Sequence, residues 1–206
     1  MTTHLRTIAT ALLPVLAMLS SAHAQPVKPP PVPPALEVPE GNTLYLKGEA
    51  RGTQNYICLP TEKGFGWTFF SPDATLFISY KFYGAEIRQQ VITHFLSPNP
   101  SEDGVPRATW QSSFDTSSVW ARAIQNSSDP NFVAEGAIPW LLLKQMGIKR
   151  GPQGGDILVA TTYIQRLNTG GGVAPATGCS TQQNVGATAL VPYTADYYFF
   201  RETQAK

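Results

Sequence analysis

Hydrophobic and polar residues alternate along much of the chain, and a period of two is the pattern of a half-buried β-strand. Over residues 75–83, one face carries only large apolar side chains: Leu76, Ile78, Tyr80 and Phe82. Gly84 predicts a turn, after which residues 86–96 form the returning strand. Glycine and proline separate the other predicted strands, which cover residues 44–50, 53–59, 64–70, 109–111, 118–125 and 157–167.

Two apolar runs depart from this alternation. Residues 191–200 are apolar and aromatic on both faces, which predicts a central strand buried on both sides. Residues 138–146 predict one short helix, because Pro139 suits a first helical position and Gly147 follows as a stop signal. Many short strands with one helix favour an antiparallel β-sandwich or a squat β-barrel, in a mainly β domain.

The first 24 residues have the order of a secretory signal peptide. His4 and Arg6 precede an apolar run over residues 8–19, and small residues end in an Ala-x-Ala pattern at Ala24. The run is shorter than the roughly 20 residues of a spanning helix. We therefore expect cleavage after Ala24, a secreted or periplasmic location and no membrane anchor in the mature chain. The alternative is an amphipathic N-terminal helix of a cytosolic protein.

Residues 25–40 form a predicted linker, with seven prolines among residues 25–39. Such a stretch favours extended polyproline II conformation, so we expect a stiff spacer; the alternative is a docking site for a proline-binding partner. A single β-rich domain over residues 41–203 and a C-terminal tail over residues 204–206 complete the predicted organisation.

The net charge and the cysteine content indicate which partners to exclude and whether a disulfide forms. Removing the signal peptide removes Arg6 from 15 basic residues, which leaves 14 against 14 acidic ones. A neutral chain has no field to attract nucleic acid, so no nucleic-acid partner is expected. Cys58 and Cys179 are the only cysteines, and in an oxidising compartment we expect a disulfide between them. Two buried free thiols, or one reactive thiol, are the alternatives.

Several segments taken together resemble the motifs of one known family. They are 52–58 (GTQNYIC), 109–111 with 115–119 (TWQ and DTSSV), 138–143 (IPWLLL), 165–171 (QRLNTGG), and Cys179 with 191–197 (VPYTADY). The chain thereby resembles the domain of unknown function 3455 family of exported bacterial and fungal proteins, over about residues 41–203. It differs at Thr116 and Ala108, where the pattern usually has Gly and Pro. The resemblance implies the domain limits, export and the cysteine pair, but no activity.

Three polar residues are candidates for catalysis: His94, Asp115 and Arg166. The Gly-x-Ser-x-Gly elbow that marks many hydrolase serines is absent. His94 has no second histidine at metal-ligand spacing, so no metal and no cofactor are predicted. A buried Asp196 would need a partner, and Arg166 is the expected one, in a structural ion pair or in a site.

Aromatic residues are the candidates for ligand binding. Trp110, Trp120 and Tyr56 are the rings that we expect to stack on a glycan or another small molecule, whereas Trp140 is expected in the core. The first hypothesis is therefore a non-catalytic binding or structural module of the periplasm or cell exterior. The second is a hydrolase of a cell-envelope or extracellular substrate that uses His94 and Asp115. A catalytic site requires these residues to meet in one pocket.

Overall fold

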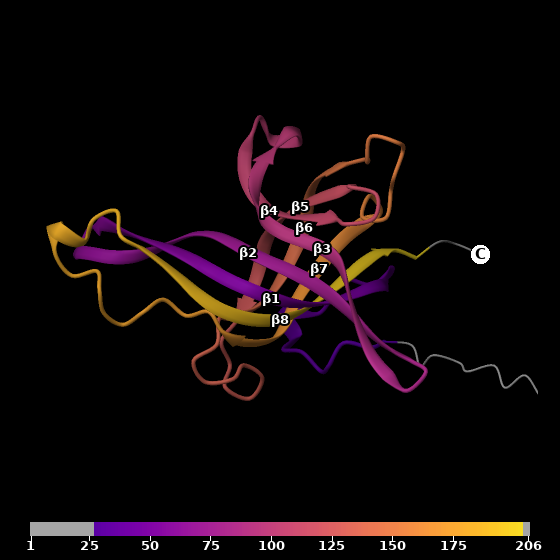
Figure 1. Cartoon of the computed structure of the whole chain (residues 1–206), viewed down its shortest axis with the longest axis horizontal. Coiled ribbons are helices and arrows are strands. Elements are labelled where there is room, and N and C mark those ends of the chain that lie inside the picture. Colours follow the sequence, from indigo (N-terminus) through magenta and orange to yellow (C-terminus); the bar gives the residue numbers. More distant parts are fainter. Residues whose placement is uncertain (1–26, 204–206) are drawn as a thin grey trace, which may run out of the picture.

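The eight strands of the domain form a closed antiparallel barrel in which each strand pairs with its neighbours in sequence and β1 pairs with β8 (Figure 1). The computed structural model describes residues 27–203. Its strands are β1 (Asn42–Thr61), β2 (Gly64–Phe82), β3 (Ala85–Asn99), β4 (Val105–Ser112), β5 (Ser118–Ser127), β6 (Trp140–Lys149), β7 (Thr161–Gly171) and β8 (Thr188–Glu202). The prediction of a sandwich or barrel is confirmed as a barrel. The predicted signal peptide and C-terminal tail lie outside the described residues.

Strands β1 and β2 are longer than predicted because neither breaks at its expected turn. Gly52 lies within β1, where it is paired with β2. Glycine suits this position because a Cβ there would collide with the backbone carbonyl of Asp73 on β2. Pro72 stays within β2, opposite Gln54 of β1. Pairing of β2 with β3 ends at Ala74, so β2 has no partner strand on one side at Pro72, and a strand edge tolerates proline.

The predicted helix over residues 138–146 is wrong, because residues 140–146 belong to strand β6. Its apolar residues alternate between two separate hydrophobic clusters. Leu141 and Leu143 face the barrel interior, whereas Trp140 and Leu142 face an outer cluster. A strand buried on both faces has a continuous apolar run, and such a run cannot be distinguished from a buried helix by its periodicity.

The outer cluster includes the end of the proline-rich segment, which the sequence predicted to be a spacer. Leu36, in the short 3-10 helix η1 (Pro34–Leu36), is fully buried against β6, β7 and β8. Gln165 Nε2 donates a hydrogen bond of 2.7 Å to the Leu36 carbonyl oxygen. This part of the segment therefore belongs to the hydrophobic packing of the domain.

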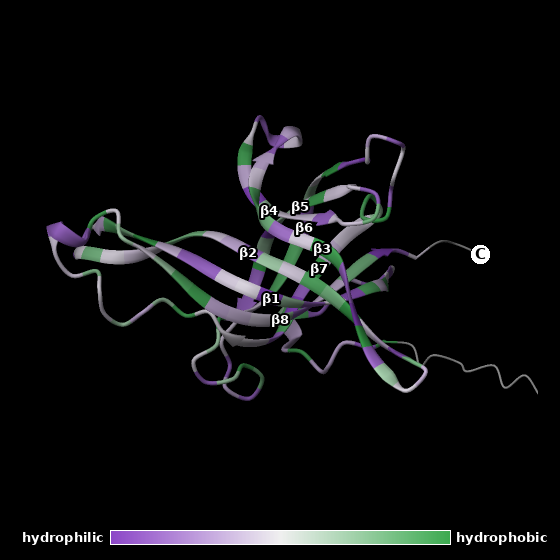
Figure 2. Cartoon of the chain, viewed as in Figure 1, coloured by the Kyte–Doolittle hydropathy of each residue, from purple (hydrophilic) through white to green (hydrophobic). Residues whose placement is uncertain are grey.

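Strand β8 has the two-sided burial that its sequence predicts. Tyr197 and Phe199 lie in the interior cluster, and Tyr198 and Phe200 lie in the outer one. Along β1 and β2, by contrast, hydrophobic and hydrophilic residues alternate (Figure 2).

The predicted disulfide between Cys58 and Cys179 is confirmed. It lies in an arm, at the left of Figure 1, made of the β1–β2 hairpin, the start of β8 and the loop before it, which holds the 3-10 helix η3 (Gln182–Asn184). Trp67 Nε1 donates to the Thr177 carbonyl oxygen at 2.9 Å, which adds a second link between hairpin and loop. Within residues 27–203, no helix is long and apolar enough to span a membrane.

Candidate functional site

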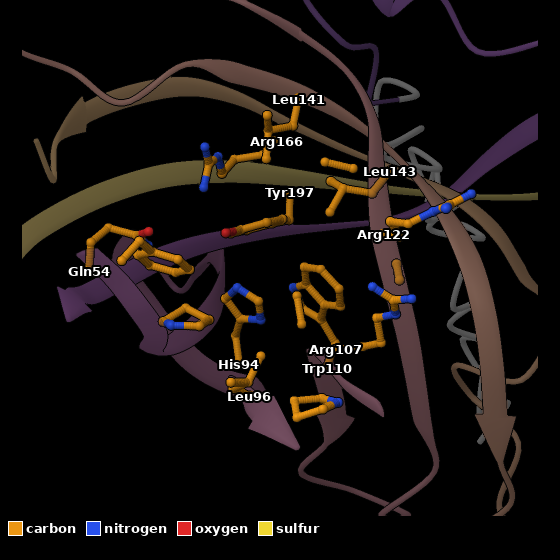
Figure 3. A pocket seen from close by; sticks show the side chains of 16 residues that line it. Gln54, His94, Leu96, Arg107, Trp110, Arg122, Leu141, Leu143, Arg166 and Tyr197 are labelled. Carbon is orange, nitrogen blue, oxygen red and sulfur yellow. The ribbon is translucent and has the colours of Figure 1, made fainter. Parts of the chain in front are cut away.

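A cavity of about 260 Å³ lies inside the barrel, and all eight strands contribute to its lining (Figure 3). Strand register explains which side chains reach it. His94 on β3 pairs with Trp110 on β4, which places their side chains next to each other on the inner face. Arg166 on β7 pairs with Leu141 on β6 and Tyr197 on β8, which forms a second inward row. The two rows face each other across the interior (Figure 3).

The rings of three aromatic residues form the wall of the cavity. His94 stacks on Trp110 with ring centroids 4.2 Å apart and an interplanar angle of 12°. Tyr197 meets both rings edge-on, at 5.2 Å from His94 and 5.5 Å from Trp110. Trp110 is the one of the three predicted ligand-binding aromatic residues that lines this cavity. It is completely buried, so it lines the cavity from within the core.

His94 is neutral at physiological pH. Its Nδ1 lies 2.9 Å from the Thr109 carbonyl oxygen, and since a carbonyl only accepts, Nδ1 carries the hydrogen. Burial of the ring lowers the pKa of His94 to about 3, although the Thr109 hydrogen bond opposes this shift. Nε2 therefore has no proton, and a base with so low a pKa accepts protons poorly near pH 7.

Arg166 brings a positive charge into the interior. Its Nη2 donates to the Pro139 carbonyl oxygen at 2.8 Å, and its buried Nε has no hydrogen-bond partner among the described residues. The predicted pairing with Asp196 is wrong. Asp196 faces outward, where its carboxylate lies 3.2 Å from Lys47 Nζ. Arg166 pairs in the ladder with Tyr197, one position further along, and adjacent residues of a strand point to opposite faces.

Two further arginines line the cavity on the side opposite to Arg166 (Figure 3). Arg107 binds Glu102 through two hydrogen bonds, Nε to Oε2 at 2.8 Å and Nη2 to Oε1 at 2.9 Å. These bonds from Arg107, with one from Asn99, lower the pKa of Glu102 to about 2. Arg122 lies on β5 and is exposed, and half-exposed Phe69 of β2 also lines this cavity. The cavity thus reaches the solvent.

Asp115 lies away from the cavity, in the β4–β5 turn. Its Oδ1 accepts hydrogen bonds from the Ser117 N–H at 3.0 Å and the Ser117 hydroxyl at 2.7 Å, and its Oδ2 accepts from the Ile157 N–H at 2.9 Å. Ser117 Oγ in turn accepts from the Leu158 N–H at 3.1 Å. The structure therefore brings His94, Trp110 and Arg166 together but places Asp115 in a link between the β4–β5 turn and the β6–β7 loop.

Replacing Asp115 with alanine is expected to lower the free energy of unfolding by about 2–4 kcal/mol, because three hydrogen bonds to a carboxylate are lost. Burial alone would raise the pKa of Asp115, but these hydrogen bonds outweigh it and lower the pKa to about 2. The stabilisation is present above the unfolded-state pKa of about 4 and disappears as pH falls toward 2. Urea unfolding at pH 7 and at pH 2.5 measures both effects.

Asp156→Ala is the matched control for this substitution. Asp156 is exposed and makes a surface ion pair of 3.3 Å with Arg150, which contributes about 0–1 kcal/mol. An equal loss of stability in the two variants at pH 7 would contradict the role assigned to Asp115.

The other two aromatic candidates do not line the cavity. Trp120 is buried on the outside of the barrel, where its Nε1 donates to Ser97 Oγ at 2.9 Å. Tyr56 donates its hydroxyl hydrogen to the Gly172 carbonyl oxygen at 2.6 Å. Sequence reasoning missed Gln54, Arg107 and Arg122, which do line it. Their residue types did not indicate that they line a cavity, since a polar residue in an alternating strand normally faces solvent. Residues 27–203 contain no group of three His, Cys, Asp or Glu side chains that could hold a metal ion.

Comparison with known proteins gives a family and no activity. The family model described as "Protein of unknown function (DUF3455)" matches residues 39–201. No curated protein and no solved structure matches the chain. The match extends from just before β1 to the end of β8, and so it includes every strand that lines the cavity. The chain belongs to the DUF3455 family of proteins of unknown function.

Proposed function

We propose that this protein is a non-catalytic binding module that holds one small molecule in the cavity of its barrel. The observation that carries the proposal is the composition of the cavity wall. It combines the His94–Trp110 stack and apolar side chains with a few buried polar groups, which is the usual composition of a small-molecule site. An apolar cavity of about 150 Å³ holds benzene, so about 260 Å³ has room for one ring with a polar substituent.

Buried polar groups without partners further support a ligand. Gln54 Nε2, Trp110 Nε1 and Arg166 Nε all belong to residues that line the cavity, and none of the three has a hydrogen-bond partner among the described residues. An unpaired buried donor costs about 1–3 kcal/mol, and a bound molecule that accepts hydrogen bonds removes this cost.

The chemistry of the lining favours binding over hydrolysis. Among the residues that line the cavity there is no serine, cysteine or carboxylate to act as a nucleophile or general base. His94 does line it, but its low pKa makes it a weak base. The alternative of a hydrolase that uses His94 with Asp115 therefore has no common site to support it.

The proposal also places the protein outside the cytoplasm. The disulfide between Cys58 and Cys179 is compatible with an oxidising compartment. The sequence of the first 24 residues supplies the signal that would direct it there. The mature protein would then bind its ligand in the periplasm or outside the cell.

A thermal-shift screen of residues 25–206, with the disulfide formed, tests the binding function. A ligand at 100 times its dissociation constant adds about 2.7 kcal/mol, which corresponds to an increase in melting temperature of roughly 5–10 °C for a domain of this size. The panel should contain single-ring compounds and monosaccharides in acidic, neutral and basic forms. We expect at least one class to raise the melting temperature.

A substitution that fills the cavity shows whether the ligand binds inside it. Ala123 lines the cavity at an exposed position, so Ala123→Phe blocks the space without removing a polar group. Ala85→Phe, at the exposed start of β3, is the matched control. We expect the thermal shift to disappear in the first variant and to persist in the second. A panel without any shift, or a shift that both variants retain, would contradict the proposal.

A further inference from the structure

The polar groups of the cavity indicate the chemical class of the ligand. This inference rests on the proposed binding function and concerns what the cavity binds. We propose that the ligand is a small carboxylate with an apolar body about the size of one ring, and that Arg166 is the residue that binds its carboxylate group.

The charge of the cavity lining favours an anion. The cavity is lined by Arg166, Arg107 and Arg122, and by no aspartate or glutamate. Glu102 neutralises Arg107 through two parallel hydrogen bonds. Arg166 takes part in no ion pair of the described residues, and its Nη2 donates only to an uncharged backbone carbonyl. A half-buried guanidinium without a counter-charge favours an anion in the adjacent space.

The buried polar groups of the lining that have no partner also favour a ligand that accepts hydrogen bonds. The three fully buried atoms of the lining that have no partner among the described residues are N–H donors, on Gln54, Trp110 and Arg166. The remaining unpartnered buried groups of the described residues, on Trp140 and Gln165, belong to the outer face of the barrel. Figure 3 shows the polar ends of Gln54, Arg166 and Tyr197 on the same side of the cavity. The unpartnered N–H donors of Gln54 and Arg166 on this side match a group that accepts hydrogen bonds.

The donors of Arg166 and the apolar wall favour a carboxylate over other anions. A guanidinium binds a carboxylate through two parallel N–H···O bonds, and Nε with Nη2 is one such pair of donors. Arg107 uses this pair to bind Glu102. Arg166 has the Nε of the same pair unoccupied. The rest of the wall is apolar and includes Leu96, Leu141 and Leu143, which suits a hydrocarbon body and not a fully charged phosphate or a sugar.

Arg166 also acts electrostatically on the groups around the cavity. Burial raises the pKa of Tyr197, and the nearby positive charge of Arg166 opposes that rise. The same charge adds to the effect of burial in keeping His94 unprotonated. Neutral His94 therefore adds no positive charge beside Arg166, and Arg166 is the charged group on the side of the cavity that holds the polar ends of Gln54 and Tyr197.

Isothermal titration of residues 25–206 with sodium benzoate and with benzamide, at pH 7.4 and low salt, tests this proposal. The two probes share ring and size but differ in charge and in their acceptors. We expect benzoate to bind at least 10-fold more tightly than benzamide. Arg166→Gln should weaken benzoate at least 10-fold and leave benzamide within 3-fold. Arg201→Gln removes an exposed arginine that does not line the cavity, and should change neither.

The outcomes separate this proposal from the binding function. Equal affinities for the two probes in the unmodified protein would overturn the carboxylate assignment while leaving small-molecule binding intact. Benzoate binding that Arg166→Gln leaves unchanged would overturn the role of Arg166. Failure of both probes to bind would overturn the carboxylate assignment, and a thermal-shift panel without any shift would then remove the binding function too. The unmodified protein decides the ligand class even if Arg166→Gln does not fold.

Discussion

Reduction of the Cys58–Cys179 disulfide is expected to cause a large loss in the free energy of unfolding. The bond joins residues 121 positions apart. In the chain-entropy model, closing a loop of this length stabilises the folded state by about 4–5 kcal/mol. For a domain of this size, that loss lowers the melting temperature by roughly 10–20 °C. Calorimetry of residues 25–206 with and without a reductant measures it.

The double variant Cys58→Ala with Cys179→Ala is the control for reduction. It should melt close to the reduced protein, and the reductant should not change its melting temperature. The cross-link lies in the arm, where Trp67 and the backbone hydrogen bonds of Cys58 with Gly186 and Ala187 also hold the loop. A decrease of less than about 3 °C would show that these contacts hold the arm alone, and would contradict the stabilisation calculated from loop length.

Acid is expected to destabilise the fold through His94. Its folded-state pKa of about 3 lies below the unfolded value near 6.5, so the unfolded state binds a proton first as pH falls. The stability that neutral His94 contributes is complete above about pH 6.5 and is lost progressively toward pH 3. We expect a decrease of about 3 kcal/mol in the free energy of unfolding between pH 7 and pH 4. Urea unfolding across this range measures it.

His94→Phe is the matched variant for this pH dependence. Phenylalanine keeps an aromatic ring against Trp110 and Tyr197 but cannot take up a proton. It leaves the Thr109 carbonyl without its donor, so the variant should be less stable at pH 7 and its stability should vary much less between pH 7 and pH 4. An unchanged pH dependence in the variant would assign the acid sensitivity to other groups.

Local patterns in the sequence predict most of the strands, and two cysteines in an exported chain predict the disulfide, but neither shows how the strands close into a barrel. Closure depends on the pairing of β1 with β8, the first and last strands, whose residues lie far apart in the sequence. The same limit explains the error over residues 138–146. Whether the run from Trp140 to Leu143 is a helix or a strand depends on what covers its second face, and that cover includes Leu36, more than 100 positions earlier.

The candidate site shows a similar division between local and long-range information. His94, Trp110 and Arg166 were identified from the sequence, and the structure places all three at one cavity. Asp196 was assigned to Arg166 from its position within an apolar strand. The register of β7 on β8 sets Arg166 opposite Tyr197 and Leu167 opposite Asp196. A difference of one residue in a strand moves a side chain to the other face, and register cannot be read from one strand alone.

The most direct test of the central claim is the side-chain N–H spectrum of ¹⁵N-labelled residues 25–206 during titration with sodium benzoate. The four tryptophans occupy different environments, and of these Trp110 lines the cavity. A ligand in the cavity predicts saturable shifts of the Trp110 indole N–H and the Arg166 Nε–H, with small shifts for Trp67, Trp120 and Trp140. Shifts that do not saturate, or that are as large for Trp67 in the arm as for Trp110, would contradict binding inside the barrel.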